Sequence, residues 1–242
     1  MENDWYEAGH VAIVTGGSRG LGKAVARELL ARGLHVVIDG RDEAALAAAR
    51  DELARVGNVI AVPGDVADQQ HVHDLIASAR QLRRLDLVVN NASTLGEIPL
   101  PRVEELSRET FERIFQVNLF APIHIMQHAL HVMRRSAEGG TIVNITSDAA
   151  IEAYPAWGGY GASKAALEHV SRVLATELDG THVRVLVADP GDMDTQMHRD
   201  AIPDADPRDL RDPADSARAL LRAVAEMKEA YVRVRLADLV PA

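Results

Sequence analysis

Cysteine is absent from this chain of 242 residues, and aromatic side chains make up only 4% of it. Without cysteine, neither a disulfide framework nor a thiolate metal site can form, and the sequence suits a reducing compartment. No apolar run approaches the roughly 20 residues that span a bilayer, and the first ten residues lack the apolar stretch of a secretory signal. We therefore expect a soluble cytoplasmic protein with no membrane partner.

Positive charge is also scarce, because 26 Lys and Arg residues face 36 Asp and Glu residues, for a net charge of −10. A chain of this charge repels a phosphate backbone, so we expect no nucleic-acid partner. The hydrophobic share of 47% and the charged share of 26% are those of ordinary globular proteins. A chain of this length can close around one core, which predicts a single domain over residues 1–242.

Short β-branched runs alternate with segments whose apolar residues recur at helical spacing. The predicted strands lie at 10–16, 35–39, 58–62, 85–90, 141–146, 182–189 and 231–236. The predicted helices include 18–33, 42–55, 68–80, 160–178 and 213–228, together with a long helical stretch after the fourth strand. This alternation predicts a doubly wound, three-layer α/β domain with a parallel sheet of about seven strands.

The least regular stretch, 190–212, is rich in Pro and Asp and directly follows a predicted strand. Open α/β sheets place their ligand loops after the strands, which predicts a substrate lid over 190–212. The alternative is a solvated surface connection with no ligand role.

A glycine-rich turn separates the first strand from the first helix, with Gly16, Gly20 and Gly22 at its glycine positions. Glycine permits positive φ and close backbone approach, and a helix N-terminus attracts phosphate. The turn therefore predicts dinucleotide binding by a Rossmann-type domain, although glycine can also serve packing alone. The same turn contains Ser18, Arg19 and Leu21.

The spacing T-G-x-x-x-G-x-G resembles the short-chain dehydrogenase/reductase family in its single-domain form. Further motifs follow in that family's order from about residue 9 to residue 236. Asp65 and Val66 match the pair that holds adenine in the family. Asn91 and Ala92 belong to a match with the family's N-N-A-G, in which Ser93 replaces the glycine.

The resemblance extends to the end of the sixth predicted strand, where Pro190, Gly191 and Thr195 match the P-G-x-x-x-T segment. In the family this segment meets the nicotinamide carboxamide. The resemblance thus implies cofactor contacts from both the opening turn and the start of the 190–212 segment.

Four residues match the family's catalytic tetrad: Asn118, Ser147, Tyr160 and Lys164. Tyr160 and Lys164 are four residues apart on a predicted helix, so their side chains project from the same face. Bringing a phenol from pKa ~10 to ~7 needs roughly 4 kcal/mol of phenolate stabilisation. A neighbouring ammonium can supply much of it, so we expect Lys164 to help lower the pKa of Tyr160.

The resemblance implies that Tyr160 exchanges a proton with the substrate oxygen while Ser147 holds that oxygen by a hydrogen bond. It also implies that Lys164 contacts the nicotinamide ribose and that Asn118 holds a water in the proton relay. Taken singly, a tyrosine on a helix, a solvated lysine and a helix-bracing asparagine are commoner. The joint order of the motifs favours an NADP(H)-dependent ketoreductase or alcohol dehydrogenase acting on a small organic carbonyl or alcohol.

The choice between NADP(H) and NAD(H) depends on the end of the second strand, Ile38-Asp39-Gly40-Arg41. An acid there bonds the ribose 2′-hydroxyl of NAD, whereas an arginine meets the 2′-phosphate of NADP. Counted from Thr15, the expected acid position is Gly40, and strand alternation turns Asp39 to the other side. With Arg41 and Arg19 beside the ribose, NADP(H) is predicted, although a register error of one residue would reverse this.

The residues around the tetrad in sequence are largely apolar, and they are candidates either for a substrate pocket or for ordinary core. They are Leu95, Ala149, Ile151, Tyr154, Trp157, Met193 and Met197.

Histidines at 124, 128 and 131 recur at helical spacing that could present imidazoles to one metal ion. No carboxylate or thiolate companion is evident, so we expect no metal site. We expect His71 and His73 to be solvated helix residues.

All three phenylalanines, Phe111, Phe115 and Phe120, lie in one helical region with further apolar residues around them. A helix that is apolar on more than one side must bury the excess in its own fold or against another subunit. Together with the family's habit of forming dimers and tetramers, this predicts a homodimer or homotetramer through helices near 104–135 and 160–178.

Two other functions remain open on the sequence. One is a catalytically silent nucleotide-binding regulatory or scaffold protein, which the intact tetrad disfavours. The other is an epimerase or dehydratase of the larger relatives, which carry an added C-terminal substrate domain, whereas about 50 residues follow Pro190 here.

Overall fold

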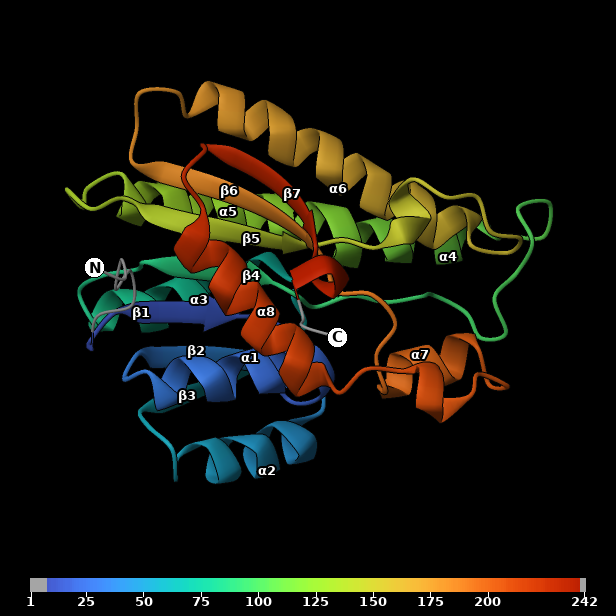
Figure 1. Cartoon of the computed structure of the whole chain (residues 1–242), viewed down its shortest axis with the longest axis horizontal. Helices are drawn as coiled ribbons and strands as arrows, with labels where there is room; N and C mark the ends of the chain where they lie inside the picture. The colour runs from blue at the N-terminus through green and yellow to red at the C-terminus, as the bar shows by residue number, and fades with distance from the viewer. Residues whose placement is uncertain (1–7, 240–242) are drawn as a thin grey trace.

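The computed structural model of the chain describes residues 8–239; most of the N-terminal segment considered above, residues 1–7, lies outside the described residues. Seven parallel strands form one sheet in the order β3-β2-β1-β4-β5-β6-β7, as Figure 1 shows. The strands are β1 (Val11–Val14), β2 (His35–Gly40), β3 (Val59–Pro63), β4 (Leu87–Asn90), β5 (Gly140–Ile145), β6 (Val183–Asp189) and β7 (Tyr231–Arg235).

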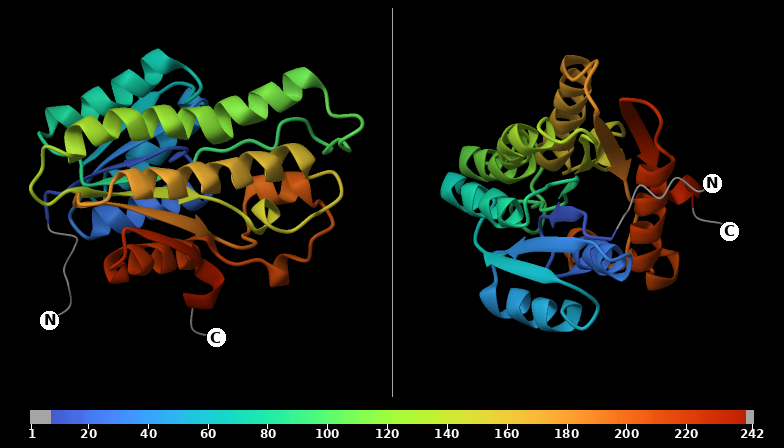
Figure 2. Two further views of the ribbon diagram at one scale, coloured as in Figure 1. Left: turned by 90° about the horizontal axis from the view of Figure 1, so that it is seen from above. Right: turned by 90° about the vertical axis from the view of Figure 1, so that its left-hand side faces the viewer.

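Helices cover both faces of this sheet, so the predicted three-layer, doubly wound Rossmann-type fold is confirmed (Figure 2). The α-helices of the described residues are α1 (Gly20–Ala31), α2 (Glu43–Leu53), α3 (Gln69–Gln81), α4 (Arg108–Phe115), α5 (Ala121–Met133), α6 (Gly158–Glu177), α7 (Gln196–Ala201) and α8 (Pro213–Glu226).

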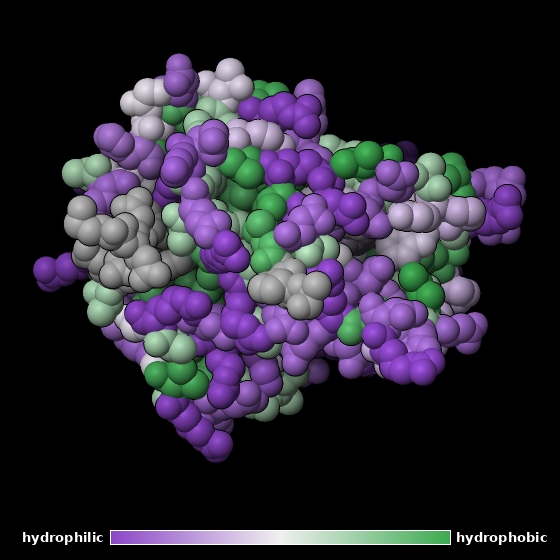
Figure 3. All heavy atoms as spheres, in the orientation of Figure 1, coloured by the Kyte–Doolittle hydropathy of each residue, from purple (hydrophilic) through white to green (hydrophobic). Residues whose placement is uncertain are grey.

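The central strands are apolar on both faces, because each face packs against helices. Val14 and Ile38 belong to the core that α1, α2 and α8 cover, while Ile13 and Val37 belong to the core under α3, α5 and α6. This is the alternation that a parallel sheet buried on both sides requires. Polar residues dominate the face seen in Figure 3, which includes α1 and α8, and apolar residues are scattered over it.

The strand order reverses between β1 and β4: β2 and β3 are added on one side of β1, and β4 and the later strands on the other. In open α/β sheets, ligands bind outside the carboxyl ends of the strands at such a switch point. The glycine-rich turn leaves β1, and the Asn91 segment leaves β4, at this point of the sheet. The topology therefore brings two of the predicted motifs together.

The long helical stretch after β4 contains a π-helical turn, Gln116–Phe120, between α4 and α5. Asn118 lies in this turn, and Pro122 stands in the first turn of α5. A π-helical turn opens the regular hydrogen-bond ladder and is frequent at functional sites. The sequence pattern predicts the helix but not this interruption.

The predicted lid segment 190–212 holds the short helix α7 and the 3-10 turn Pro207–Asp209. An isolated parallel bridge between Met193 and Arg211 ties its two ends together. Among residues 8–239, no helix has the length and apolar character needed to cross a bilayer.

His71 is not the solvated residue expected from its place in a polar helix, because its side chain is only 5% exposed. Its Nε2 lies 3.1 Å from Oδ2 of Asp39, and Oδ1 of Asp39 accepts a hydrogen bond of 2.5 Å from the Gly16 amide. Burial raises the pKa of the Asp39 carboxyl, while the bonds from His71 and Gly16 oppose that rise. The expectation was wrong because the polar residues beside His71 in the sequence suggested a solvated position, whereas its side chain faces Asp39 on β2.

We predict that His71→Leu destabilises the fold by about 1–3 kcal/mol, because the buried Asp39 carboxyl loses one of its partners while the volume of the side chain is largely kept. Urea unfolding followed by circular dichroism measures the change. His73→Leu, at an exposed position of the same helix, is the matched control. Equal stability of the two variants would contradict a structural role for the Asp39–His71 pair.

Candidate active site

The glycine-rich turn is held from behind by the segment that follows β4. The Asn91 side chain donates to the Thr15 carbonyl at 2.8 Å, and the backbone amides of Asn91 and Ala92 each donate to Thr15 Oγ1 at 3.0 Å. Gly16 has a φ of +66°, which favours glycine. Asn91 and Ala92 therefore brace the turn, through contacts within the protein.

Two observations are compatible with a pyrophosphate at this turn. A Cβ on Gly22 would stand 2.3 Å from the Gly16 carbonyl oxygen, so only glycine allows α1 to start this close to the turn. The residue before α1, Arg19, makes no side-chain cap, so its side chain leaves the first amides of the helix available to an anion.

The remaining residues of the turn take different positions. Leu21 is buried in the core under α1, so only its backbone can face a ligand. Arg19 is exposed. Ser18 faces the end of β2, since a Cβ on Gly40 would lie 3.2 Å from Ser18 Oγ. Gly40 therefore occupies the position beside the turn, and the Asp39 carboxylate is buried against His71 and the Gly16 amide.

The pair predicted to hold adenine lies after β3. Val66 is buried against Val117 and Ala121, next to Ala92. The Asp65 carboxylate accepts hydrogen bonds from the Ala67 amide at 3.0 Å and from Arg113 at 2.5 Å. Burial works to raise the pKa of Asp65, but these two bonds hold it below its usual value. Arg41, exposed at the end of β2, also contributes a favourable charge to Asp65.

The segment after β6 returns to the glycine-rich turn. Gly191, at a φ of +70°, donates its amide to Asp189 at 3.0 Å, and the Pro190 carbonyl accepts from Ser216. Thr195 begins α7 and lies next to Gly20, with its methyl group 3.3 Å from the position of a Gly20 Cβ. The start of the predicted lid therefore lies against the turn that opens α1.

Tyr160 and Lys164 lie side by side on α6, and both side chains are buried. The Lys164 Nζ is 5.5 Å from the centre of the Tyr160 ring and donates to the Ile145 carbonyl at 2.9 Å. Burial lowers the pKa of Lys164 to about 8. The predicted spacing thus places both groups at the end of β5, where one ligand could contact them.

The pKa of Tyr160 moves in the opposite direction from the one expected. Burial is the largest cause, and with the charges of Asp189 and Asp148 it raises the pKa to about 12 in the protein alone. Hydrogen-bonding contacts from Ser93 and Ser147 to the Tyr160 side chain act to lower it. The ammonium of Lys164 is desolvated and bonded to a carbonyl, so it does not offset the burial of the phenol.

Ser147 follows β5 and begins a short 3-10 turn, Asp148–Ala150. Its hydroxyl donates to Asp148 Oδ1 at 2.9 Å, and Asp148 Oδ2 accepts from the Tyr154 hydroxyl at 2.9 Å. Asp148 thus orients Ser147 beside Tyr160. The sequence analysis missed Asp148; its place directly after Ser147 was the one signal available.

Asn118 is fully buried, and all its side-chain bonds are made within the protein. Its oxygen accepts from the Thr94 amide at 2.8 Å and from Ser93 Oγ at 3.1 Å. Its amide group donates to the Thr94 carbonyl at 2.9 Å and to Ser163 Oγ at 3.0 Å. The structure brings Asn118, Ser147, Tyr160 and Lys164 to the same end of the sheet.

An apolar cluster surrounds the Tyr160 ring. It contains Leu95 and Ala149, with Leu100, Trp157, Met197 and Ala201 packed against them. Met197 and Ala201 come from α7, so the predicted lid lies over this cluster. A neighbouring cavity of about 670 Å³ shares Ala149 and Trp157 with the cluster and is also lined by Tyr154.

Two of the pocket candidates lie elsewhere. The Ile151 side chain is exposed and belongs to neither the cluster nor the cavity. Met193 packs against the core under α1 and α8. Both follow a motif residue closely in sequence, but the backbone turns their side chains away from Tyr160.

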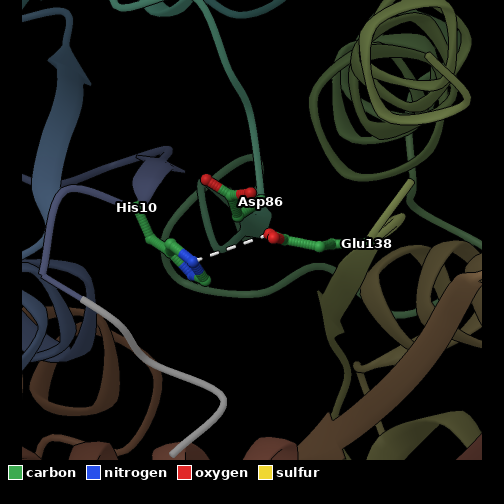
Figure 4. A group of neighbouring side chains, drawn as sticks. All are labelled: His10, Asp86 and Glu138. Carbon is green, nitrogen blue, oxygen red and sulfur yellow. Dashed lines mark ion pairs between the residues drawn. The ribbon is translucent and has the colours of Figure 1, made fainter. Parts of the chain in front are cut away.

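A second polar cluster lies near the start of β1. Figure 4 shows His10 and Asp86 beside Glu138, and their ligand atoms lie within 4.8 Å of one another. Arg84 donates to both carboxylates, at 2.7 and 2.8 Å to Asp86 and at 2.8 Å to Glu138. One guanidinium thus already bonds both carboxylates, which makes the cluster an ion-pair network that joins two loops.

The histidines at 124, 128 and 131 gain a neighbour that the sequence did not suggest. His73 on α3 lies against His128 on α5, with 3.2 Å between their Nε2 atoms. Burial, followed by the charges of His73, His131 and His124, lowers the pKa of His128.

Comparisons with known proteins agree with this geometry. Residues 10–206 match the short chain dehydrogenase family. The rhamnolipids biosynthesis 3-oxoacyl-(acyl-carrier-protein) reductase of Pseudomonas aeruginosa is 38% identical over 197 residues, which cover 79% of this chain and 76% of that protein.

Solved structures are similar over almost the whole chain. A short chain dehydrogenase from Mycobacterium smegmatis has a TM-score of 0.81 at 28% identity and covers 98% of this chain and 95% of its own. The Pseudomonas aeruginosa RhlG/NADP active-site complex has a TM-score of 0.83 at 32% identity, with 97% of each chain covered. The likeness includes the sheet, the glycine turn and the tyrosine helix together, and the chain therefore belongs to the short-chain dehydrogenase/reductase family of oxidoreductases.

Proposed function

We propose that this enzyme is an NADP(H)-dependent ketoreductase or alcohol dehydrogenase that acts on an apolar carbonyl compound or the matching alcohol. The observation that carries the proposal is the buried pair of Tyr160 and Lys164, at the same edge of the sheet as the glycine-rich turn that opens α1. A nicotinamide cofactor supplies or accepts the hydride when bound.

Residues of this chain would bind the two ends of the cofactor. The first amides of α1 would hold the pyrophosphate, with Gly16, Gly20 and Gly22 allowing its close approach. Thr195, Pro190 and Gly191 would border the nicotinamide end, since they lie at the start of the lid next to Gly20.

Tyr160 would give its proton to the substrate oxygen in reduction and take it back in oxidation. A neutral phenol is the required form of the acid, and burial keeps Tyr160 protonated. Ser147 would hold the substrate oxygen, Lys164 would meet the nicotinamide ribose, and Asn118 would maintain the backbone through which a relay water is held.

The pocket supports an apolar substrate, because Leu95, Trp157 and Met197 lie around the Tyr160 ring. The reductase from Pseudomonas aeruginosa acts, by its name, on a 3-oxoacyl group. An apolar carbonyl compound with an adjoining chain or ring is therefore the substrate class to test first. Because α7 packs on this cluster, segment 190–212 would open for substrate entry and close during turnover.

The direct test is a panel of aliphatic, aromatic and 3-oxoester carbonyl compounds assayed with NADPH and with NADH. Cofactor oxidation with an apolar ketone supports the proposal. Tight cofactor binding without oxidation across the panel favours the alternative of a catalytically silent nucleotide-binding protein.

We predict that Tyr160→Phe lowers kcat at least 10²-fold while the dissociation constant of NADPH changes little, because the variant loses the acid and keeps the glycine turn. Fluorescence titration measures cofactor binding, and steady-state kinetics measures turnover. Tyr231→Phe, which also loses one tyrosine hydroxyl but at the first residue of β7, at the other end of the strands, is the control. Substantial activity in the Tyr160 variant would refute its role as the acid.

The preference for NADP(H) is proposed from the end of β2. Gly40 faces Ser18, Asp39 is buried against His71, and Arg41 follows at the surface. No carboxylate of β2 is thus placed to bind a ribose 2′-hydroxyl. An NADP complex among the similar solved structures is compatible with this proposal.

Arg41→Ala should weaken NADPH binding by roughly tenfold or more and leave NADH binding nearly unchanged, because a charge-assisted bond to the 2′-phosphate is lost. Isothermal titration with each cofactor checks this. Arg50→Ala, on the outer surface of α2, should change neither affinity. An equal loss of affinity for NADPH and NADH in the Arg41 variant would show that Arg41 does not bind the 2′-phosphate.

We also propose that the enzyme is a homodimer or homotetramer through the helices near 104–135 and 160–178. Ile114, Val117 and Leu119 are buried within the fold, but Phe111 and Phe120 are 37% and 43% exposed and Val173 on α6 is 43% exposed. Apolar side chains left exposed on both predicted helices support an interface there.

Introducing charge at these positions, as in the double variant Phe111→Glu/Val173→Glu, should shift the mass in light scattering from an oligomer to a monomer. Burying two carboxylates in an apolar interface would oppose association. Ile202→Glu, a change at another exposed apolar residue, serves as the comparison. A monomeric parent protein would overturn the proposal.

A further inference from the structure

Asp39, near the end of β2, is bonded twice to the glycine-rich turn. Its backbone carbonyl accepts from the Gly17 amide at 3.0 Å, and its Oδ1 accepts from the Gly16 amide at 2.5 Å. The Asp39 side chain is buried, so water does not compete for this bond. Two consecutive amides of the turn are therefore held in place by one residue of β2.

The second carboxylate oxygen of Asp39 reaches α3. This oxygen, Oδ2, lies 3.1 Å from Nε2 of His71, whose side chain is also buried. The His71 ring fills the space next to Gly64, because a Cβ on Gly64 would stand 2.2 Å from Nδ1 of the ring. The Gly64 amide in turn donates to the Gly40 carbonyl at 3.1 Å. His71 therefore supports the backbone that leaves β3.

These contacts run from one predicted cofactor segment to another. They begin at Gly16 in the glycine-rich turn and end at Gly64, which directly precedes Asp65, a residue predicted to hold adenine. One dinucleotide would contact both segments, so its affinity depends on how the two are placed relative to each other. The bond between Asp39 and His71 joins them.

Packing alone does not account for this pair. Val37, two residues before Asp39 on the same face of β2, and Leu75, one turn after His71 on α3, both belong to the apolar core between these elements. Apolar side chains at 39 and 71 would extend that core without the cost of burying a carboxylate. They could not accept a hydrogen bond from the Gly16 amide, as Asp39 does. The polar pair therefore serves the turn.

We propose that Asp39 and His71 are positioning residues of the cofactor site, which hold the glycine-rich turn and the segment after β3 at the spacing that one dinucleotide requires. This inference rests on the proposed function, in which these two segments bind the cofactor. Both side chains are buried, so they would act through the Gly16 amide and through the backbone at Gly64. Because NADP(H) and NAD(H) share the parts that these segments would bind, the pair should matter equally to both.

The test measures the dissociation constants of NADPH and NADH by fluorescence titration, in the full-length protein and at a temperature where each variant is folded. His71→Leu removes the bond to Asp39 and should weaken both cofactors equally, by about tenfold or more, because the two segments are no longer held in place. Arg41→Ala differs, since it should weaken NADPH alone. His71→Gln keeps a side-chain N–H at the reach of Nε2 and should bind both cofactors within about twofold of the parent.

The matched control is Asp86→Ala. Asp86 is also a buried carboxylate that accepts from a backbone amide of β1, that of Val11 at 2.8 Å, but it lies at the opposite end of that strand. This variant should lose stability in urea and keep both dissociation constants within about twofold of the parent. An equal loss of affinity in Asp86→Ala and His71→Leu would overturn the inference, because general destabilisation would then suffice.

Two further outcomes would also overturn it. One is an unchanged affinity in His71→Leu, and the other is an equal loss in His71→Gln, because the missing ring and not the bond to Asp39 would then be the cause. If His71→Leu does not fold, His71→Asn takes its place in the comparison with His71→Gln, since its shorter amide does not reach Asp39.

Kinetics separates this inference from the function on which it rests. With a carbonyl compound that the parent reduces, His71→Leu should raise KM for NADPH about tenfold or more and leave kcat within about twofold, whereas a loss of folded protein would lower kcat. A parent that binds both cofactors but reduces no compound would refute the proposed activity and leave the role of the pair intact. Cofactor binding that is the same in the parent and in His71→Leu would refute this inference alone.

Discussion

Burial of Tyr160 next to Lys164 is the constraint on which the arrangement of the site depends. Burial destabilises the charged form of each group. It therefore raises the pKa of the phenol to about 12 and lowers the pKa of the amine to about 8. The Ile145 carbonyl accepts a hydrogen bond from the amine, and the Trp157 ring packs edge-on against the Tyr160 ring. The surroundings of the pair therefore decide how readily a proton leaves the tyrosine.

The backbone brings this pair to the same edge of the sheet as the glycine-rich turn. Asn91 holds the glycine turn from the end of β4, and the π-helical turn at Asn118 places a buried amide between Thr94 and α6. Both residues act first as braces, and a chain without these bonds would lose the relative position of the turn and the tyrosine helix. The relative position of the proposed functional residues therefore depends on hydrogen bonds between loops at one edge of the sheet.

The sequence predicts the fold because the central strands are apolar on both faces and the helices that cover the sheet each have one buried side. Those patterns are local, and the seven strands follow from them. The motifs likewise place the tetrad, since spacing along α6 determines that Tyr160 and Lys164 share a face. The environment of His71 could not be predicted, because its partner Asp39 lies 32 residues away on a neighbouring strand. The same holds for the pKa of Tyr160, which depends on burial and on contacts from separate loops.

Residues at the active site act on one hydroxyl in opposite directions. The carboxylates of Asp148 and Asp189 oppose the phenolate by charge, whereas Ser93 and Ser147 favour it by hydrogen bonding. Asp148 also takes the hydrogen of Ser147, so the serine of the tetrad is the less mobile of the two hydroxyls. The Ser93 hydroxyl donates to Asn118 at 3.1 Å, where the Asn118 oxygen also accepts from the Thr94 amide. Asp148 therefore acts on Tyr160 in two ways: its charge opposes the phenolate, and it takes the hydrogen that Ser147 could otherwise donate to the phenol oxygen.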